Sequence, residues 1–203
     1  MSARPARRSI VVATRNPNKL SELERILDSY ELAPLPESVV LPPEDGETFV
    51  ENALIKARAA QRATGGAVLA DDSGIEAAAL AGRPGVHSAR YAGPEATDEA
   101  NLALLLRELD GVEDRSAAYV CAIAHVAADG AETVTEARCE GTVATRPRGE
   151  GGFGYDPAFL PADVGDGRTM AELSVDEKHA ISHRGRAARA IAATLAGGKG
   201  SRS

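Results

Sequence analysis

Apolar residues in this chain fall into short continuous runs that alternate with stretches of helical spacing. The first run, 10–13, is rich in β-branched residues and predicts a buried strand. Asn16 and Pro17 come next, as a helix cap and a first helical residue, and apolar side chains at helical spacing continue to Tyr30. The beginning of the chain therefore predicts a strand, a loop and a helix in succession.

The same alternation of strand and helix signals continues through the middle of the chain. Thr48 and Glu51 have the spacing of a capping box, and the helix that they begin is predicted to stop at Gly65. A short strand is expected over 67–70. A further helix is expected over 98–109.

Two long β-rich segments, 117–128 and 132–143, lie on either side of an Asp-Gly pair at 129–130, which is a hairpin signal. A second capping box follows, and a last helix is expected over 185–196. Strands that alternate with helices, together with one hairpin, predict an α/β fold with a mixed sheet.

The length and composition indicate an ordinary globular protein. We expect residues 1–203 to form a single domain, with 1–8 and 197–203 as frayed ends. The net charge of −7 argues against a general nucleic-acid binder, and no run approaches the ~18 apolar residues of a membrane span. The two cysteines do not form a C-x-x-C motif, which fits a reducing cytoplasm.

Two adjacent acids follow an apolar run in the segment VLADDSGIEA, residues 68–77. We expect the strand to end there, with Asp71 and Asp72 at its end. Two neighbouring carboxylates repel unless they share a cation or a proton, which favours a metal site or an acid–base site. The alternative is a simple turn, in which Asp72 caps the segment at Ser73 and Gly74.

A candidate phosphate site lies where the first strand turns into the first helix. Thr14, Asn16, Asn18 and Lys19 gather at this junction, where backbone N–H groups and the helix dipole favour an anion. The alternative is an ordinary helix cap followed by a surface lysine.

Glu44 stands in a proline-rich loop before the second helix, where the cap does not require an acid. Mg²⁺ prefers one or two carboxylates and leaves its other positions to water and phosphate, so Glu44 is a candidate partner for the acids at 71–72. Lys56 lies two turns into the same helix, and taken alone it is more typical of a solvated position.

Phe153 and Tyr155 are two of only seven aromatic residues, and both lie in the glycine-rich segment 149–159. Glycines allow close backbone approach, and with Asp156 the segment suits a planar base that stacks on Phe153. The alternative is a tight turn whose aromatic side chains point inward.

A basic group, Lys178, His183 and Arg184, stands beside an expected break between two helices. Cationic donors at such a place suit a phosphate group or a base carbonyl. The alternative is a solvated helix face.

Six short motifs occur in order within residues 10–196, a range that is nearly the whole chain. They are TRNPNK (14–19), ETFVENALIKA (47–57), ADDSG (70–74), PGVHSARY (84–91), GGFGYDP (151–157) and AISHRGRA (180–187). Each motif is weak alone, but six in this order and at consistent separations are highly specific. On these motifs the chain resembles the noncanonical purine nucleoside triphosphate pyrophosphatases, also called inosine triphosphate pyrophosphatases.

The resemblance implies hydrolysis of ITP, dITP and XTP to the monophosphate and pyrophosphate, with Mg²⁺ as cofactor. It implies an elongated central mixed sheet flanked by helices, two lobes with an active-site cleft between them, and a homodimer. No nucleic acid or membrane partner is expected, and the location is expected to be cytoplasmic.

The family's functional residues carry over to positions in the matching motifs. Asp72 is implied as the general base, and Glu44 with Asp72 as the metal ligands. The substrate contacts implied are Thr14, Arg15, Asn16, Pro17, Asn18, Lys19, Lys56, Ser73, Phe153, Gly154, Tyr155, Asp156, Lys178, His183 and Arg184.

Two other functions stay open from the sequence. One is a related house-cleaning pyrophosphatase with another base preference, and the other is a nucleotide-binding sensor without turnover. Asp72 argues against the sensor, because a protein that only binds nucleotide needs phosphate contacts but no base near the phosphorus.

Overall fold

A computed structural model describes residues 9–197. The terminal segments for which frayed ends are predicted lie outside the described residues, except that Gly197 ends the last helix. Among the described residues, none of the helices combines the length and the hydropathy that crossing a bilayer requires.

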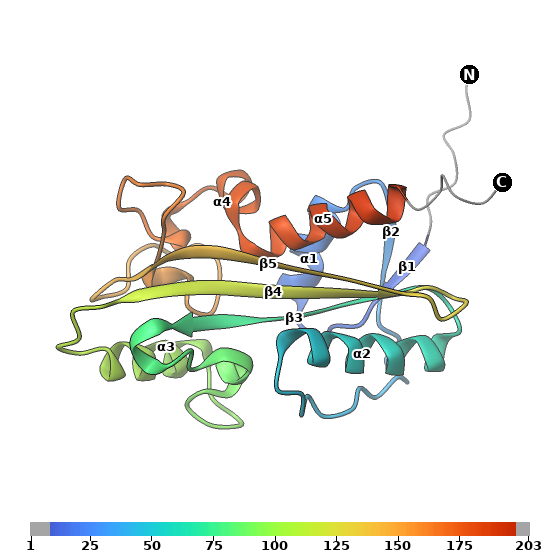
Figure 1. Cartoon of the computed structure of the whole chain (residues 1–203), viewed down its shortest axis with the longest axis horizontal. Helices are drawn as coiled ribbons and strands as arrows, with labels where there is room; N and C mark the ends of the chain where they lie inside the picture. The colour runs from blue at the N-terminus through green and yellow to red at the C-terminus, as the bar shows by residue number, and fades with distance from the viewer. Residues whose placement is uncertain (1–8, 198–203) are drawn as a thin grey trace, which may run out of the picture. The chain divides into compact units, whose positions relative to one another are not determined.

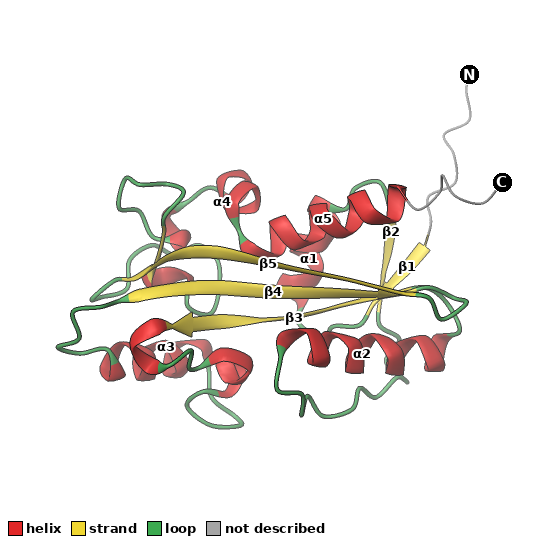
Figure 2. Cartoon of the chain, in the orientation of Figure 1, coloured by secondary structure: helices red, strands yellow, loops and turns green. Residues whose placement is uncertain are grey.

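The fold is α/β, as the sequence predicts (Figure 2). The helices are α1 (Pro17–Ile26), α2 (Phe49–Thr64), α3 (Asp98–Glu108), α4 (Val175–Ile181) and α5 (His183–Gly197). The strands are β1 (Ser9–Val12), β2 (Glu31–Pro34), β3 (Val68–Ala77), β4 (Ser116–Val126), β5 (Glu132–Val143) and β6 (Phe159–Pro161).

The strands form a mixed sheet in the order β2-β1-β3-β4-β5-β6. Strand β1 pairs in parallel with both β2 and β3, whereas β5 and β6 pair in antiparallel fashion. The three long strands β3, β4 and β5 lie side by side in Figure 1. The predicted hairpin is confirmed, and it joins β4 to β5 with backbone bonds between Ala127, Gly130 and Ala131.

The chain forms two compact units. Unit 1 takes its described residues from Met1–Asp72, Ala122–Thr135 and Ala187–Ser203. Unit 2 consists of Ser73–Cys121 and Glu136–Arg186. The chain passes from one unit to the other inside β3, β4, β5 and α5, and the first of these crossings is the peptide bond between Asp72 and Ser73.

The predicted helix starts are confirmed by their caps. The Asn16 side chain accepts a hydrogen bond from the Asn18 N–H at 2.9 Å, and Pro17 is the first residue of α1. Thr48 and Glu51 form the reciprocal capping box of α2, and Gly65 ends that helix with a positive φ of 68°. These signals are local, so the chain sequence alone specifies them.

Strand β3 corrects the prediction that the apolar run ends at the two acids. It continues for ten residues, Val68–Ala77, so Asp71 and Asp72 lie in its interior and form neither a strand end nor a turn. Nearly every position of β3 is buried. A strand that is covered on both faces shows no alternation of apolar and polar residues, which hides its length from the sequence pattern.

Helix α2 directs one face into the interior of unit 1. The buried positions recur at helical spacing and are Phe49, Asn52, Ala53, Lys56, Ala57 and Ala60. Four of these residues are apolar, so the buried face is that of an ordinary amphipathic helix except at Asn52 and Lys56. This stripe corrects the expectation that Lys56 is solvated, because the residue is only 5% exposed.

Unit 2 has its own hydrophobic core. Leucines of α3 pack there with Ile75 of β3, Tyr119 of β4 and Phe159 of β6. Gly74 lies beside this core, next to the 3-10 turn Gly85–Arg90. The Ser88 hydroxyl accepts a hydrogen bond from the Ile75 N–H at 2.9 Å, which draws the turn against the strand.

We expect Gly74→Ala to destabilise the protein, because the new methyl group would lie 2.3 Å from Ser88 Oγ and 2.5 Å from the Gly85 carbonyl oxygen. Overpacking of this kind lowers the free energy of unfolding by about 2–3 kcal/mol. Chemical denaturation measures the change. Gly66→Ala is the matched control, since no atom lies within 4 Å of its added carbon. Equal losses in both variants would contradict the packing argument.

Candidate active site

Asp71 and Asp72 are neighbours in sequence, but they belong to opposite faces of β3. Successive side chains of a strand alternate across the sheet, so the two carboxylates point away from each other. Each one meets a lysine from a different helix. The repulsion expected for two carboxylates that share one site is therefore relieved by geometry and by separate partners.

Asp71 forms an ion pair with Lys19 of α1, with 3.1 Å between Lys19 Nζ and Asp71 Oδ2. The Asp71 side chain has no exposed surface, and that of Lys19 is 16% exposed. A buried carboxylate of this kind needs a charged partner. The pair holds the ammonium group of Lys19 beside β3 and leaves it in contact with solvent.

Lys56 of α2 lies between two carboxylates. Its Nζ atom is 3.0 Å from Glu44 Oε1 and 3.4 Å from Asp72 Oδ1. The Lys56 and Asp72 side chains are each 7% exposed, whereas that of Glu44 is 32% exposed. The ammonium group of Lys56 is thus shielded from solvent on the Asp72 side and accessible to solvent on the Glu44 side.

The loop that carries Glu44 is fixed by side chains of α2. Asn52 is fully buried, and its Oδ1 atom accepts a hydrogen bond from the Gly46 N–H at 2.8 Å. Glu51 accepts bonds from the N–H groups of Glu47 and Thr48 at 2.7 and 3.1 Å. A helix cap and a buried amide therefore present Glu44 to Lys56.

The carboxylate–lysine cluster, Glu44, Asp71, Asp72, Lys19 and Lys56, contains three acids and two ammonium groups. Burial raises the pKa of Asp72, and Glu44 and Asp71 add to this effect against the opposing pull of Lys56 and Lys19. Burial acts to lower the pKa of Lys56, but the three acids outweigh it and raise that pKa. Lys56 thus stays charged, and Asp72 is a stronger base than an exposed aspartate.

The cluster also suits a divalent cation. Within residues 9–197, no three His, Cys, Asp or Glu side chains converge as a site built from protein ligands alone would need. Asp72 Oδ2 is nonetheless buried without a hydrogen-bond partner among the described residues. Glu44 and Asp72 contact the same ammonium group, that of Lys56, so their carboxylates lie close together. One or two carboxylates beside a phosphate are a typical Mg²⁺ environment, so Asp72 and Glu44 fit the metal.

The start of α1 is organised mainly for the helix itself. Thr14 Oγ1 accepts a hydrogen bond from the Asn16 N–H at 3.1 Å, and the Asn16 side chain accepts from Asn18 and Lys19. The cap therefore occupies two of the N–H groups proposed for phosphate. Lys19 is the residue of this segment that contacts β3.

Arg15 has a structural contact that the sequence did not indicate. Its guanidinium donates to the carbonyl oxygens of Leu35 and Pro36 at 2.9 and 2.8 Å, and to that of Val39 at 2.7 Å. The side chain thereby holds the segment after β2 against the start of α1.

In unit 2, Asp156 joins three parts of the chain. Its Oδ2 atom accepts hydrogen bonds from the Phe153 N–H at 3.0 Å and from Lys178 Nζ at 2.7 Å. Its Oδ1 atom accepts from the Tyr119 hydroxyl at 3.1 Å. Gly152 is needed beside this carboxylate, because a Cβ there would lie 2.1 Å from Asp156 Oδ2.

Cationic groups gather over the ring of Phe153. Lys178 Nζ lies 4.8 Å from the ring centroid and Arg184 Cζ lies 5.7 Å from it. Arg184 is only 2% exposed, and its Nη2 atom donates to Ser73 Oγ at 2.8 Å. With these contacts the arginine–aromatic cluster of unit 2 consists of Ser73, Tyr119, Phe153, Asp156, Lys178, His183 and Arg184.

Two other residues of the glycine-rich segment have contacts of a different kind. Tyr155 is buried, and its hydroxyl donates to the Ser88 carbonyl at 2.7 Å, so its side chain belongs to the core of unit 2. The Gly154 N–H donates to Asp98 at the start of α3. The open alternative of an inward-pointing aromatic is therefore right for Tyr155, whereas Phe153 is only partly buried.

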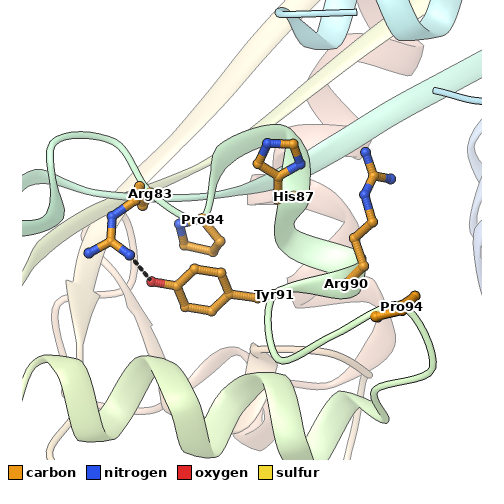
Figure 3. Close-up of a pocket in the computed structure, with 6 residues that line it drawn as sticks. All are labelled: Arg83, Pro84, His87, Arg90, Tyr91 and Pro94. Carbon is orange, nitrogen blue, oxygen red and sulfur yellow. Dashed lines mark hydrogen bonds between the residues drawn. The ribbon is translucent and has the colours of Figure 1, made fainter. Parts of the chain in front are cut away.

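A separate pocket of about 300 Å³ lies in unit 2 (Figure 3). The residues that line it are Arg83, Pro84, His87, Arg90, Tyr91 and Pro94. Arg83 donates to the Tyr91 hydroxyl at 3.1 Å and pairs with Glu108 at 3.3 Å, and Tyr91 also donates to Glu108. Burial and Glu108 raise the pKa of Tyr91 to about 12, so the hydroxyl stays a donor. These contacts fasten the PGVHSARY loop to α3.

Two residues that belong to or support the clusters were not singled out from the sequence. Asn52 holds the Glu44 loop, and Tyr119 contacts both Asp156 and His183. Asn52 could have been found, since it is a polar residue on the apolar stripe of α2. Tyr119 lies in a buried strand of apolar residues and carries no local signal.

The α/β fold carries a carboxylate–lysine cluster and an arginine–aromatic cluster, which are the kinds of side chain that a protein binding phosphate and a planar base would use. The family model described as the Ham1 family matches residues 10–194. The chain therefore belongs to the Ham1 family, which confirms the resemblance drawn from the six motifs.

Curated relatives and solved structures give the same result. The chain is 50% identical over 186 residues to a protein of Syntrophobacter fumaroxidans named dITP/XTP pyrophosphatase, covering 88% of this chain and 78% of that one. It is 52% identical over 191 residues to one of the same name from Mycobacterium bovis, covering 88% and 90%. The HAM1 protein structure from Coxiella burnetii has a TM-score of 0.83 at 43% identity, covering 93% of this chain and 98% of that one.

We expect Asp72→Asn to raise the melting temperature of the metal-free protein near neutral pH. The folded state disfavours the charged form of Asp72, because burial raises its pKa. The stability that Asp72 provides as a neutral group is present in acid and is lost as the pH rises through the folded pKa. The asparagine variant escapes this loss, so the gap in melting temperature should open as the pH rises above the ordinary pKa of an aspartate.

Asp45→Asn is the control for this measurement, because it removes the same charge from an exposed position on the Glu44 loop. Its melting temperature should follow the wild type across the pH range. A lower melting temperature for Asp72→Asn than for wild type at neutral pH would show that the ion pair with Lys56 outweighs the burial of Asp72.

Proposed function

We propose that this protein hydrolyses noncanonical purine nucleoside triphosphates, ITP, dITP and XTP, to the monophosphate and pyrophosphate. The observation that carries the proposal is the buried Lys56 ammonium group between the carboxylates of Glu44 and Asp72. The names of the relatives, dITP/XTP pyrophosphatase, support the same reaction. Removal of such nucleotides would clean the precursor pool.

The reaction requires a water molecule that has lost a proton. In the proposed mechanism the water oxygen forms a bond to the α-phosphorus, and the bond from that phosphorus to the bridging oxygen of the β-phosphate breaks. Asp72 accepts the proton of the water, and pyrophosphate leaves with the bridging oxygen. A carboxylate whose pKa is raised by burial is better matched to this task than an exposed one.

The two lysines deal with the negative charge of the triphosphate. Lys19 is held by Asp71, and Lys56 is held by Glu44 and Asp72. Both ammonium groups are thereby fixed before a substrate arrives, so little reorganisation is needed as charge builds on the leaving group. Asp71 acts through Lys19, which explains why it stands next to the general base.

Mg²⁺ belongs to the same proposal. Asp72 and Glu44 would hold it, together with phosphate oxygens. When bound, the metal neutralises phosphate charge and makes the phosphorus easier to attack. The excess of acids over ammonium groups in the cluster supports a dication at this place.

The arginine–aromatic cluster is proposed to read the base. Hypoxanthine and xanthine carry a 6-oxo acceptor, whereas adenine carries a 6-amino donor. Arg184 and His183 are buried side chains that can donate to an oxygen, and the 6-amino group of adenine would offer them a donor in place of an acceptor. Guanine shares the 6-oxo group, and its 2-amino group is proposed to be rejected near the backbone of Phe153–Asp156.

The remaining expectations are also proposals. A homodimer and a cytoplasmic location follow from the family resemblance, and the mass of the protein in solution tests the first of them. A panel of purine and pyrimidine triphosphates under identical conditions separates this function from a related pyrophosphatase with another base preference. Release of pyrophosphate separates an enzyme from a sensor.

Asp72→Asn is expected to lower the rate of pyrophosphate release from ITP by ~10²–10⁴-fold, because it keeps the shape of a general base and removes its charge. Asp71→Asn should be milder, since Asp71 acts through Lys19. Asp45→Asn serves as the exposed control and should match the wild type. Turnover of ITP by Asp72→Asn within a few-fold of wild type would remove Asp72 from the role of base.

Chelation of divalent metal is expected to abolish the activity, and added Mg²⁺ to restore it. Full activity after chelation would remove Mg²⁺ from the mechanism.

Arg184→Ala is expected to raise KM for ITP and to narrow the gap between ITP and ATP, which we expect to be ~10⁴-fold or more in the wild type. Steady-state kinetics with ITP, XTP, GTP and ATP measure the ratios. Arg186→Ala is the matched control, because that arginine contacts Asp163 and the Arg138 carbonyl. If Arg184→Ala slows ITP and ATP by the same factor, Arg184 serves phosphate or structure and does not read the base.

A further inference from the structure

Tyr119 connects the two ends of the arginine–aromatic cluster. It lies on the part of β4 that belongs to unit 2, and only 6% of its surface is exposed. Its ring stacks on the imidazole of His183, with 4.5 Å between centroids and 8° between planes. Its hydroxyl donates to Asp156 Oδ1 at 3.1 Å. One side chain therefore contacts both the glycine-rich segment and the first residue of α5.

Asp156 links Tyr119 to the other residues of the arginine–aromatic cluster. The same carboxylate accepts hydrogen bonds from the Phe153 backbone and from Lys178, and Lys178 lies over the Phe153 ring. A shift of Asp156 would therefore move Phe153 and Lys178 together. If the Tyr119 ring moved as well, it would no longer stack on His183 and fix the orientation of the imidazole.

We propose that Tyr119 is a positioning residue for base recognition, which holds Asp156 and His183 in the register that distinguishes a 6-oxo from a 6-amino purine. The inference rests on the proposed function and assigns Tyr119 no contact with the substrate.

The ring and the hydroxyl have separate tasks in this proposal. The parallel stack fixes the orientation of the imidazole, and so fixes where its N–H groups point. The hydroxyl fixes the carboxylate that carries the glycine-rich segment. Burial, followed by the charge of Asp156, raises the pKa of Tyr119 well above that of free tyrosine, so the hydroxyl remains a donor throughout the neutral range.

An ordinary core tyrosine would have a different pattern of contacts. Tyr119 does pack against Phe159 of the unit 2 core, with 4.5 Å between ring centroids. Core packing alone, however, needs neither a charge-assisted bond to a buried carboxylate nor a ring parallel to a histidine. The two contacts with proposed base-reading residues are what separate a positioning role from a packing role.

Two substitutions separate the tasks. Tyr119→Phe keeps the stack and removes the bond to Asp156, and we expect it to narrow the ratio of kcat/KM for ITP over ATP by about tenfold. Tyr119→Leu removes the bond and the stack, and we expect a narrowing of about a hundredfold. GTP discrimination should weaken in the same order, because Phe153 is held through Asp156.

Inhibition by inorganic tripolyphosphate provides a readout without a base. Its inhibition constant should stay at the wild-type value in both variants, because Lys19 and Lys56 are untouched. Tyr91→Phe is the control for the loss of a tyrosine hydroxyl in unit 2, and Leu105→Ala is the control for the loss of core packing there. Both controls should keep the wild-type ratio of ITP to ATP, even where their melting temperature falls.

Proton NMR of the four histidine rings tests the stack without any turnover. The His183 ring protons should carry an upfield ring-current shift in wild type and in Tyr119→Phe, and lose it in Tyr119→Leu. If the wild type turns over ITP and both Tyr119 variants keep its ratio of kcat/KM for ITP over ATP, the inference is wrong and the proposed function stands. The same conclusion follows if Leu105→Ala changes that ratio as much as the Tyr119 variants do. Absence of ITP turnover in the wild type would overturn the proposed function, and this inference with it.

Discussion

The burial of one lysine side chain constrains the whole of unit 1. An ammonium group in the interior is several kcal/mol unfavourable unless it is paired. Lys56 therefore requires a carboxylate within reach, and its contacts with Asp72 and Glu44 fix where α2 lies against β3 and the path of the loop before the helix. Asn52 and the capping box of α2 hold that loop, so they serve the ion pair as well as the helix.

The pleat of β3 separates the carboxylates of Asp71 and Asp72, which would otherwise repel each other, and gives each its own lysine partner. Asp71 and Asp72 face opposite sides of the strand, and each is bound by a lysine from a different helix. The same two contacts draw α1 and α2 to β3. A buried ion pair adds little net stability, because the cost of desolvation offsets the attraction, so the value of these pairs in the proposed function lies in where they place two ammonium groups before a phosphate arrives. Burial raises the pKa of Asp72 against the opposing effect of Lys56 and Lys19, so the charged form of Asp72 is less favourable in this strand than in water.

The local signals of the sequence were sufficient for much of the fold. The caps of α1, α2 and α4 and the hairpin between β4 and β5 are encoded within a few residues, and all four predictions are confirmed. The end of β3 was predicted wrongly, because acids are unfavourable within a strand and only their distant lysines explain them. The contact of Tyr119 with Asp156 and that of Arg15 with the Leu35 carbonyl were not predicted either, because both join residues that are distant in the sequence.

The two clusters follow different physical rules, and the difference matches the two demands of a selective pyrophosphatase. Phosphate is the same in every nucleotide, so the proposed phosphate role suits the carboxylate–lysine cluster, whose charge acts over distance and tolerates water on the Glu44 side. Bases differ by single groups, so the proposed base-reading role suits the arginine–aromatic cluster, whose donors are buried and directional. Asp72 and Ser73 are consecutive residues, and they belong to the first and the second cluster respectively. A single peptide bond of β3 therefore joins the proposed base to the contact partner of Arg184.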